Sequence, residues 1–190
     1  MFAYLIAWGV FYGLHSLLAA GKIKVYFKST APSFFPYYRL AYNLFHLIFS
    51  AILLWWGISC KGALLYERQM VVGILFLISG LTLSLMAFRS FDIPAFLGVD
   101  VVSSSSKNTT ELIQTGLYAW VRHPLYSGIV LIILGIICCL PYQPLLLFAA
   151  VTFVYLPFGI YWEEEKLRRE FGPVYDRYAQ GVKRLIPGVW

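Results

Sequence analysis

Residues 125–162 read LYSGIVLIILGIICCLPYQPLLLFAAVTFVYLPFGIYW, a stretch without a charged side chain. Its two apolar runs, 125–140 and 145–162, each approach the roughly 20 residues that an α-helix needs to cross a bilayer. The segment PYQP at 141–144 separates them, and its prolines interrupt helical hydrogen bonding. The pattern predicts two membrane helices joined in a tight helical hairpin, with 125–140 as the shorter crossing.

Three further apolar runs, at 2–20, 40–58 and 70–88, are long enough to span a bilayer. The chain is 60% apolar and only 13% charged, so it has too little polar surface to coat a soluble globule. We therefore predict an all-α integral membrane protein with about five transmembrane helices. No basic segment precedes the first run, which favours a retained helix over a cleaved signal peptide.

The distribution of Lys and Arg predicts the orientation of these helices, because positive residues stay on the cytoplasmic side. With the N-terminus outside and the C-terminus in the cytoplasm, thirteen of the 15 basic residues lie inside, and only Lys61 and Arg68 lie outside. This arrangement suits a bacterial inner membrane or an ER-type membrane. The basic residues alternate with apolar runs and form no continuous patch, so the net charge of +6 does not indicate nucleic-acid binding.

The first polar motif is TGLYAWVRHPLYSG, residues 115–128, directly before an apolar run. Pro124 suits the first turn of that helix, where its missing amide costs nothing. The helix N-terminus and its dipole then lie beside Arg122 and His123, which makes an anion-binding pocket at the membrane face. The alternative is an ordinary helix start whose arginine reaches the lipid headgroups.

The second motif is the run Glu163-Glu164-Glu165, directly after the last apolar run. Three adjacent carboxylates near an anionic leaflet require cationic partners, and i,i+4 pairs with Arg168 and Arg169 supply only some of them. In the five-span arrangement both motifs lie on the inner face and meet. Such a site offers cations to a carboxylate and glutamates to an amine or ribose hydroxyls. S-adenosylmethionine, an amino acid joined to a nucleoside, has these groups.

Together, GLYAWVRHPLYSG and the later E-E-x-x-L-x-x-x-F-G-x-x-Y-x-x-Y resemble the isoprenylcysteine carboxyl methyltransferase family and related membrane methyltransferases of phospholipid amines and small thiols. The resemblance covers residues 112–187. It implies that Arg122 and, by a looser alignment, Arg184 lie close to the reacting groups. It also implies that S-adenosylmethionine is bound by Gly116, Tyr118, His123, Pro124, Tyr126, Glu163, Glu164 and Leu167, the last packing against the adenine.

The expected activity is therefore methyl transfer from S-adenosylmethionine to a lipophilic or membrane-partitioning acceptor with a carboxylate, thiol or amine. Residues 112–190 are the predicted cofactor region, and residues 1–111, three spans, are the predicted acceptor-side wall. One alternative is an NADPH-dependent sterol or steroid-type reductase, which carries a similar R-H-P-x-Y segment. Another is a non-enzymatic transporter or assembly factor, but the sequence lacks the internal symmetry expected of a transporter. The acceptor and the oligomeric state stay open.

Several other residues attract a functional interpretation. His15 and His46 lie within spans, where a neutral imidazole bonded to a neighbouring helix is favoured over a functional site. Arg39 and Asn43 share a helical face with His46 and could line a polar cavity. Asp92 and Asp100 suit helix caps, and residues 103–110 suit a linker better than a mobile cover. The spacing of Cys60, Cys138 and Cys139 predicts no metal site.

Overall fold

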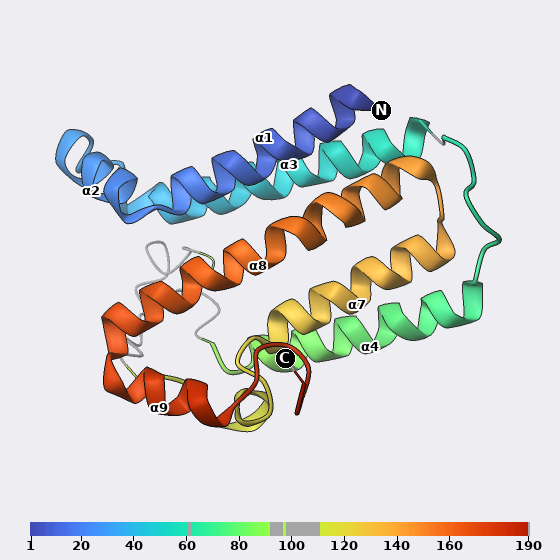
Figure 1. The fold of residues 1–190 in the computed structure, drawn as a ribbon. Helices are drawn as coiled ribbons and strands as arrows, with labels where there is room; N and C mark the ends of the chain where they lie inside the picture. The colour runs from blue at the N-terminus through green and yellow to red at the C-terminus, as the bar shows by residue number, and fades with distance from the viewer. Residues whose placement is uncertain (61, 92–96, 98–110, 190) are drawn as a thin grey trace. The chain divides into compact units, whose positions relative to one another are not determined.

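The computed structural model describes residues 1–60, 62–91, 97 and 111–189, and within them the regular structure is helical (Figure 1). Lys61, Asp92, Asp100, Lys107 and the predicted linker at 103–110 lie outside the described residues. The helices in chain order are α1 (Phe2–Ala19), α2 (Gly21–Thr30), η1 (Phe35–Tyr37), α3 (Tyr38–Cys60), α4 (Met70–Phe88), η2 (Gly116–Ala119), α7 (Pro124–Cys139), α8 (Gln143–Phe171) and α9 (Pro173–Gly181).

Four of the predicted crossings are confirmed as helices long and apolar enough to span a membrane: α1, Phe35–Cys60, α4 and α8. Fewer than a third of the residues in each apolar window are buried, as expected where lipid is the solvent. Helix α7 has 16 residues and is about 24 Å long, shorter than the roughly 30 Å hydrocarbon layer. A fifth crossing and the orientation of the chain therefore stay predictions.

The chain packs as two compact units, neither of which is one continuous stretch. The first unit comprises residues 1–63, 92–108 and 142–151, and the second comprises residues 64–91, 109–141 and 152–190. Helix α8 begins in the first unit and ends in the second. The predicted division of roles between residues 1–111 and 112–190 stays a prediction.

In the first unit, α1 and α3 lie side by side around buried aromatic rings. Trp8 is fully buried and its ring centroid lies 4.5 Å from that of Phe148. The hydroxyl of Tyr4 lies 2.5 Å from the position that a Cβ on Gly57 would occupy, so only glycine lets α3 approach α1 there. Aromatic packing against a small residue thus holds this helix pair together.

Both membrane histidines bond to Tyr42, through different groups of that residue. The Tyr42 hydroxyl of α3 lies 2.8 Å from Nδ1 of His15 in α1, which is the interhelical hydrogen bond expected of a neutral membrane histidine. His46 is buried, and its Nδ1 bonds the Tyr42 carbonyl of its own helix at 2.8 Å. Of the predicted polar face, Arg39 is exposed, and Asn43 donates to the Leu97 carbonyl at 2.9 Å. A polar wall for substrate there stays a prediction.

In the second unit, α7 packs along α4 through glycines spaced seven residues apart on each helix. A Cβ on Gly80 would lie 2.7 Å from the Gly128 carbonyl oxygen, and a Cβ on Gly135 would lie 2.8 Å from that of Gly73. The connection from α7 to α8 is as short as predicted, but the extensive packing of α7 is against α4. Two glycine faces allow a close approach of backbones that larger side chains prevent.

Candidate active site

The Arg122-His123-Pro124 turn is held in place by the C-terminal segment of the chain. Val121 and Lys183 form an isolated parallel bridge. The Arg122 amide donates to the Lys183 carbonyl at 2.7 Å, and the His123 amide donates to the Arg184 carbonyl at 3.0 Å. Pro124 is buried and begins α7, as predicted. Two segments distant in sequence are thereby fixed beside each other at the start of that helix.

The Glu164 carboxylate is the centre of the site and is completely buried. Its Oε1 lies 3.1 Å from Arg122 Nη2 and 3.3 Å from His123 Nε2. Arg184 Nη2 donates to Oε2 at 2.9 Å, while Arg184 Nε contacts both carboxylate oxygens at 3.2 Å. The predicted meeting of the Arg-His-Pro turn with the glutamate run is thus seen, through Glu164.

Two carboxylates and two guanidinium groups belong to this cluster, but only Glu164 is buried between the arginines, while Glu163 lies at the half-exposed edge. Two guanidinium groups face one buried carboxylate, and the hydrogen bond from Arg184 to Glu164 raises the pKa of Arg184, which stays charged at physiological pH. Arg122 Nε is buried and has no hydrogen-bond partner among the described residues. The unused donor, on a guanidinium group beside a second one, leaves the buried side of the cluster able to bind an anionic group.

Two tyrosines of α9, which sequence reasoning did not assign to the site, complete its wall. Tyr175 is fully buried, and burial together with the negative charge of Glu164 raises its pKa to about 12. Tyr178 donates from its hydroxyl to the Tyr118 carbonyl at 2.6 Å, which ties α9 to η2. Their i,i+3 spacing in the Y-x-x-Y motif is the signal that places both on one helical face.

Arg168 joins α8 to α9 at the edge of the site. Its Nη1 lies 2.8 Å from Glu165 Oε1, its Nε lies 3.4 Å from Asp176 Oδ1, and its guanidinium lies 5.9 Å from the Tyr175 ring centroid. The Glu165 partner is at i,i+3, where the sequence suggested an i,i+4 pair with Arg169. Both members of the Glu165–Arg168 pair are about one-third exposed, so it is a surface ion pair, in contrast to Glu164.

The remaining predicted residues lie around this cluster at different depths. Glu163 is 44% exposed, with Oε2 3.8 Å from His123 Nδ1. The Tyr126 ring centroid lies 5.5 Å from that of His123, and Tyr118 is buried. Gly116 is exposed with φ +63°, and no atom lies within 4 Å of where a Cβ would be. Leu167 is half-buried, one turn beyond Glu163.

The cluster holds both charged and neutral hydrogen-bonding groups within a few ångströms. It can accept an anion at the guanidinium groups and a cation at the half-exposed Glu163 carboxylate, so it suits a zwitterionic ligand. Within the described ranges, no three His, Cys, Asp or Glu residues gather as a metal site requires.

A family model of phospholipid methyltransferases matches residues 68–174, more than half of the chain. The chain belongs to the phospholipid methyltransferase family. As a member of this family it carries Arg122, His123 and Glu164 within the matched region, while Arg184 lies beyond it. The suspected group of membrane methyltransferases is thereby confirmed. Membership favours methyl transfer over the reductase and transporter alternatives.

Three relatives show how far this likeness extends. A methanethiol S-methyltransferase of Crocosphaera subtropica is 28% identical over 94% of this chain and 71% of its own length. Methanethiol S-methyltransferase 1 of Bradyrhizobium diazoefficiens is 43% identical over 37% of this chain and 24% of its own. Protein-S-isoprenylcysteine O-methyltransferase B of Arabidopsis thaliana is 35% identical over 42% of this chain and 41% of its own. No solved structure matches significantly.

Proposed function

We propose that this family member is a membrane-embedded enzyme that moves a methyl group from S-adenosylmethionine to a membrane-partitioning thiol. The observation that carries the proposal is the buried Glu164 carboxylate with Arg122, His123 and Arg184 around it. A buried carboxylate held by three cationic or hydrogen-bonding side chains has a high desolvation cost, so such clusters occur where a specific geometry is needed.

The residues present fit this cofactor. The unpartnered Nε of the Arg122 guanidinium suits the carboxylate of its amino-acid part. The half-exposed Glu163 suits its amine or ribose hydroxyls. Gly116, Tyr118, Tyr126 and Leu167 would form the remaining wall, with Leu167 against the adenine. Because Glu164 already has its partners, it would act by positioning the arginines and His123, with Pro124 fixing the turn.

When bound, S-adenosylmethionine supplies a methyl group on a positively charged sulfonium sulfur, and transfer to a thiolate cancels both charges. Arg122 and Arg184 would hold the acceptor as an anion beside the cofactor. The proton of a neutral thiol would pass to His123, whose Nε2 lies 3.3 Å from Glu164 Oε1 and whose Nδ1 lies 3.8 Å from Glu163 Oε2. The protein's contribution is then to align the acceptor and to exclude water, and positioning alone can supply about 7–11 kcal/mol of the barrier.

A thiol is the best supported of the three acceptor classes. The methanethiol S-methyltransferase of Crocosphaera subtropica matches 94% of this chain, a share that extends well beyond residues 112–190 into the spans where acceptor contacts are expected. The isoprenylcysteine relative matches only 42% of it. We place the reaction at the cytoplasmic face, because the basic residues predict that the turn and the C-terminus lie inside.

The test is methyl transfer by the purified protein in lipid nanodiscs, using methyl-labelled S-adenosylmethionine. Ethanethiol, a prenylated cysteine with a free carboxylate, and phosphatidylethanolamine represent the three acceptor classes. We expect the label in a thioether product, at a rate at least tenfold above that with either other acceptor. Labelling only of the carboxylate or the amine would refute the thiol, and no labelling of any acceptor beyond a protein-free control would refute the activity.

A further inference from the structure

The N-terminal part of the chain has an unbalanced positive charge. Residues 1–63 contain five Lys and Arg and not one Asp or Glu. Four of the five lie within 22–39: Lys22, Lys24 and Lys28 in α2, and Arg39 in the first turn of α3. Positive charge on a membrane protein is attracted to anionic headgroups when it lies at the bilayer surface.

Helix α2 is built to lie at a membrane surface. The chain turns at Ala20, which has an extended backbone, so α2 leaves the direction of α1 (Figure 1). Ile23 and Phe27, one turn apart, are half-buried, whereas Lys22, Lys24 and Lys28 are exposed. The Phe27 ring centroid lies 5.0 Å from that of Tyr38, which anchors α2 to the start of α3. The half-buried face is thus apolar and attached, and the exposed surface carries the three lysines together with Val25 and Tyr26, which are 68% and 60% exposed.

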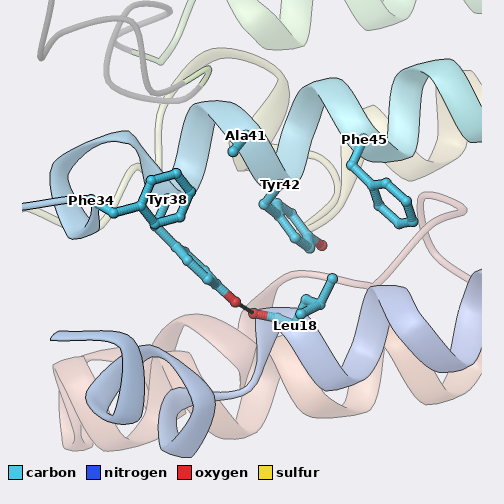
Figure 2. A pocket seen from close by; sticks show the side chains of 6 residues that line it. All are labelled: Leu18, Phe34, Tyr38, Ala41, Tyr42 and Phe45. Carbon is cyan, nitrogen blue, oxygen red and sulfur yellow. Dashed lines mark hydrogen bonds between the residues drawn. The ribbon is translucent and has the colours of Figure 1, made fainter. Parts of the chain in front are cut away.

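Directly beside this anchor is an apolar pocket of about 180 Å³, shown in Figure 2. It is lined by Leu18, Phe34, Tyr38, Ala41, Tyr42 and Phe45. The Tyr38 hydroxyl donates to the Leu18 carbonyl at 2.7 Å, so this polar group is already satisfied. The pocket is slightly larger than an apolar cavity of about 150 Å³ that binds benzene. It has room for a short hydrocarbon segment and no partner for a headgroup.

We propose that α2 and this pocket bind an anionic membrane phospholipid, with part of one acyl chain in the pocket and the phosphate among the basic residues 22–39. A free anion bound by the lysines would leave the apolar pocket unfilled, so the pocket favours an occupant with a hydrocarbon chain. The exposed Lys22 and Lys28 favour an anionic over a zwitterionic lipid. Phe27 and Tyr38 connect the two parts, so chain and headgroup are recognised together. The residues of this site belong to the first unit, whereas the Glu164 cluster belongs to the second.

The experiment is native mass spectrometry of the full chain in detergent with phosphatidylglycerol or phosphatidylcholine of identical acyl chains. Two changes test the two parts: the double change Lys22→Gln and Lys28→Gln for the headgroup, and Ala41→Phe for the pocket. Lys166→Gln, an exposed lysine of α8, is the charge control. Ala51→Phe, at an exposed position of α3, is the matched control for added bulk.

We expect the wild-type protein to retain phosphatidylglycerol at least tenfold more than phosphatidylcholine. The double lysine change should remove most of that preference, roughly fivefold for each lysine, while Ala41→Phe should lower retention of both lipids. The controls should match the wild type. Phe34→Ala, at a 43% exposed position of the pocket wall, should also lower retention of both lipids. This second pocket variant tests the pocket even if Ala41→Phe does not fold.

Three results would overturn the proposal. The first is equal retention of the two lipids by the wild-type protein. The second is retention that neither pocket variant changes, which would leave only general attraction to a charged surface. The third is displacement of the bound lipid by 10 mM inorganic phosphate, roughly the concentration range of weak anion sites, since it would show that the basic residues bind a free anion.

Discussion

The two units of this protein use charge in opposite ways. In the described part of the first unit, aromatic rings pack between the helices. Residues 1–63, which belong to this unit, include basic residues but no acidic one. The second unit buries a carboxylate completely and surrounds it with Arg122, His123 and Arg184. Charge on an exposed helix suits attraction to a membrane surface, whereas charge buried in a cluster fixes geometry. We therefore seek the chemistry in the second unit and the contact with charged lipid in the first.

The largest expected effect comes from neutralising the buried carboxylate. Glu164→Gln leaves Arg122 and Arg184 without their counter-charge, and breaking a buried ion pair costs about 3–5 kcal/mol. We expect methyl transfer to fall at least 100-fold and the free energy of unfolding to drop by a similar energy. Activity and chemical unfolding in detergent measure the two effects.

The matched control is the next residue along the chain. Glu165→Gln removes only the exposed ion pair with Arg168, worth about 0–1 kcal/mol. We expect activity within a few-fold of wild type. Equal losses of methyl-transfer activity in Glu164→Gln and Glu165→Gln would contradict the different roles of the buried and the exposed carboxylate.

The next largest effect tests the glycine contact of α4 with α7. Gly80→Ala would push a methyl group against the Gly128 carbonyl and the Ile132 amide, and both obstacles are backbone. We expect a loss of about 3 kcal/mol in the free energy of unfolding. Gly13→Ala in α1 is the control, since a Cβ there meets no described atom within 4 Å. That change should stabilise the protein slightly, by up to about 1 kcal/mol.

A third prediction concerns alkaline pH. Burial raises the pKa of Tyr175 to about 12, from an ordinary value near 10. Because the unfolded state releases this proton first, the stabilisation is complete below about pH 10 and is lost between about pH 10 and 12. Tyr175→Phe should reduce this alkaline loss by about 2 kcal/mol. Unfolding followed from pH 8 to 12 measures it, with the exposed Tyr26→Phe as the control; an unchanged slope would contradict the assignment.

The smallest effect is expected in the first unit. Tyr42→Phe removes the hydrogen bond between α3 and His15, which should cost about 0.6–1 kcal/mol of stability. Affinity for S-adenosylhomocysteine should change less than twofold, because the proposed cofactor residues all belong to the second unit. A larger loss of affinity, measured by calorimetry, would show that residues of the first unit contribute to cofactor binding.

Hydropathy and connectivity predict most of the architecture and the centre of the site. The boundaries of α4 agree with the predicted run 70–88, because a membrane span needs a long apolar segment and little else. The convergence of Arg122 with the glutamate run was also predictable, since a short connection joins α7 to α8. The loosely aligned Arg184 turns out to bind Glu164 at 2.9 Å.

What the sequence did not reveal depends on packing between distant segments. Glycines seven residues apart have no hydropathy signal, so Gly80 and Gly128 gave no sign that α7 would pack on α4. Burial of Tyr175 follows from the docking of α9, which a local pattern does not encode. The pocket beside α2 likewise forms from residues of three separate segments.

The most direct test of the central claim is calorimetric titration of S-adenosylhomocysteine into the purified protein in detergent, with the reduced dinucleotide NADPH as the comparison. We predict saturable binding of S-adenosylhomocysteine alone, at least tenfold weaker in His123→Ala and in Glu163→Gln and unchanged in Glu165→Gln. Saturable binding of NADPH alone, or equal affinity of S-adenosylhomocysteine for all four proteins, would contradict a methyl-donor site at the Glu164 cluster.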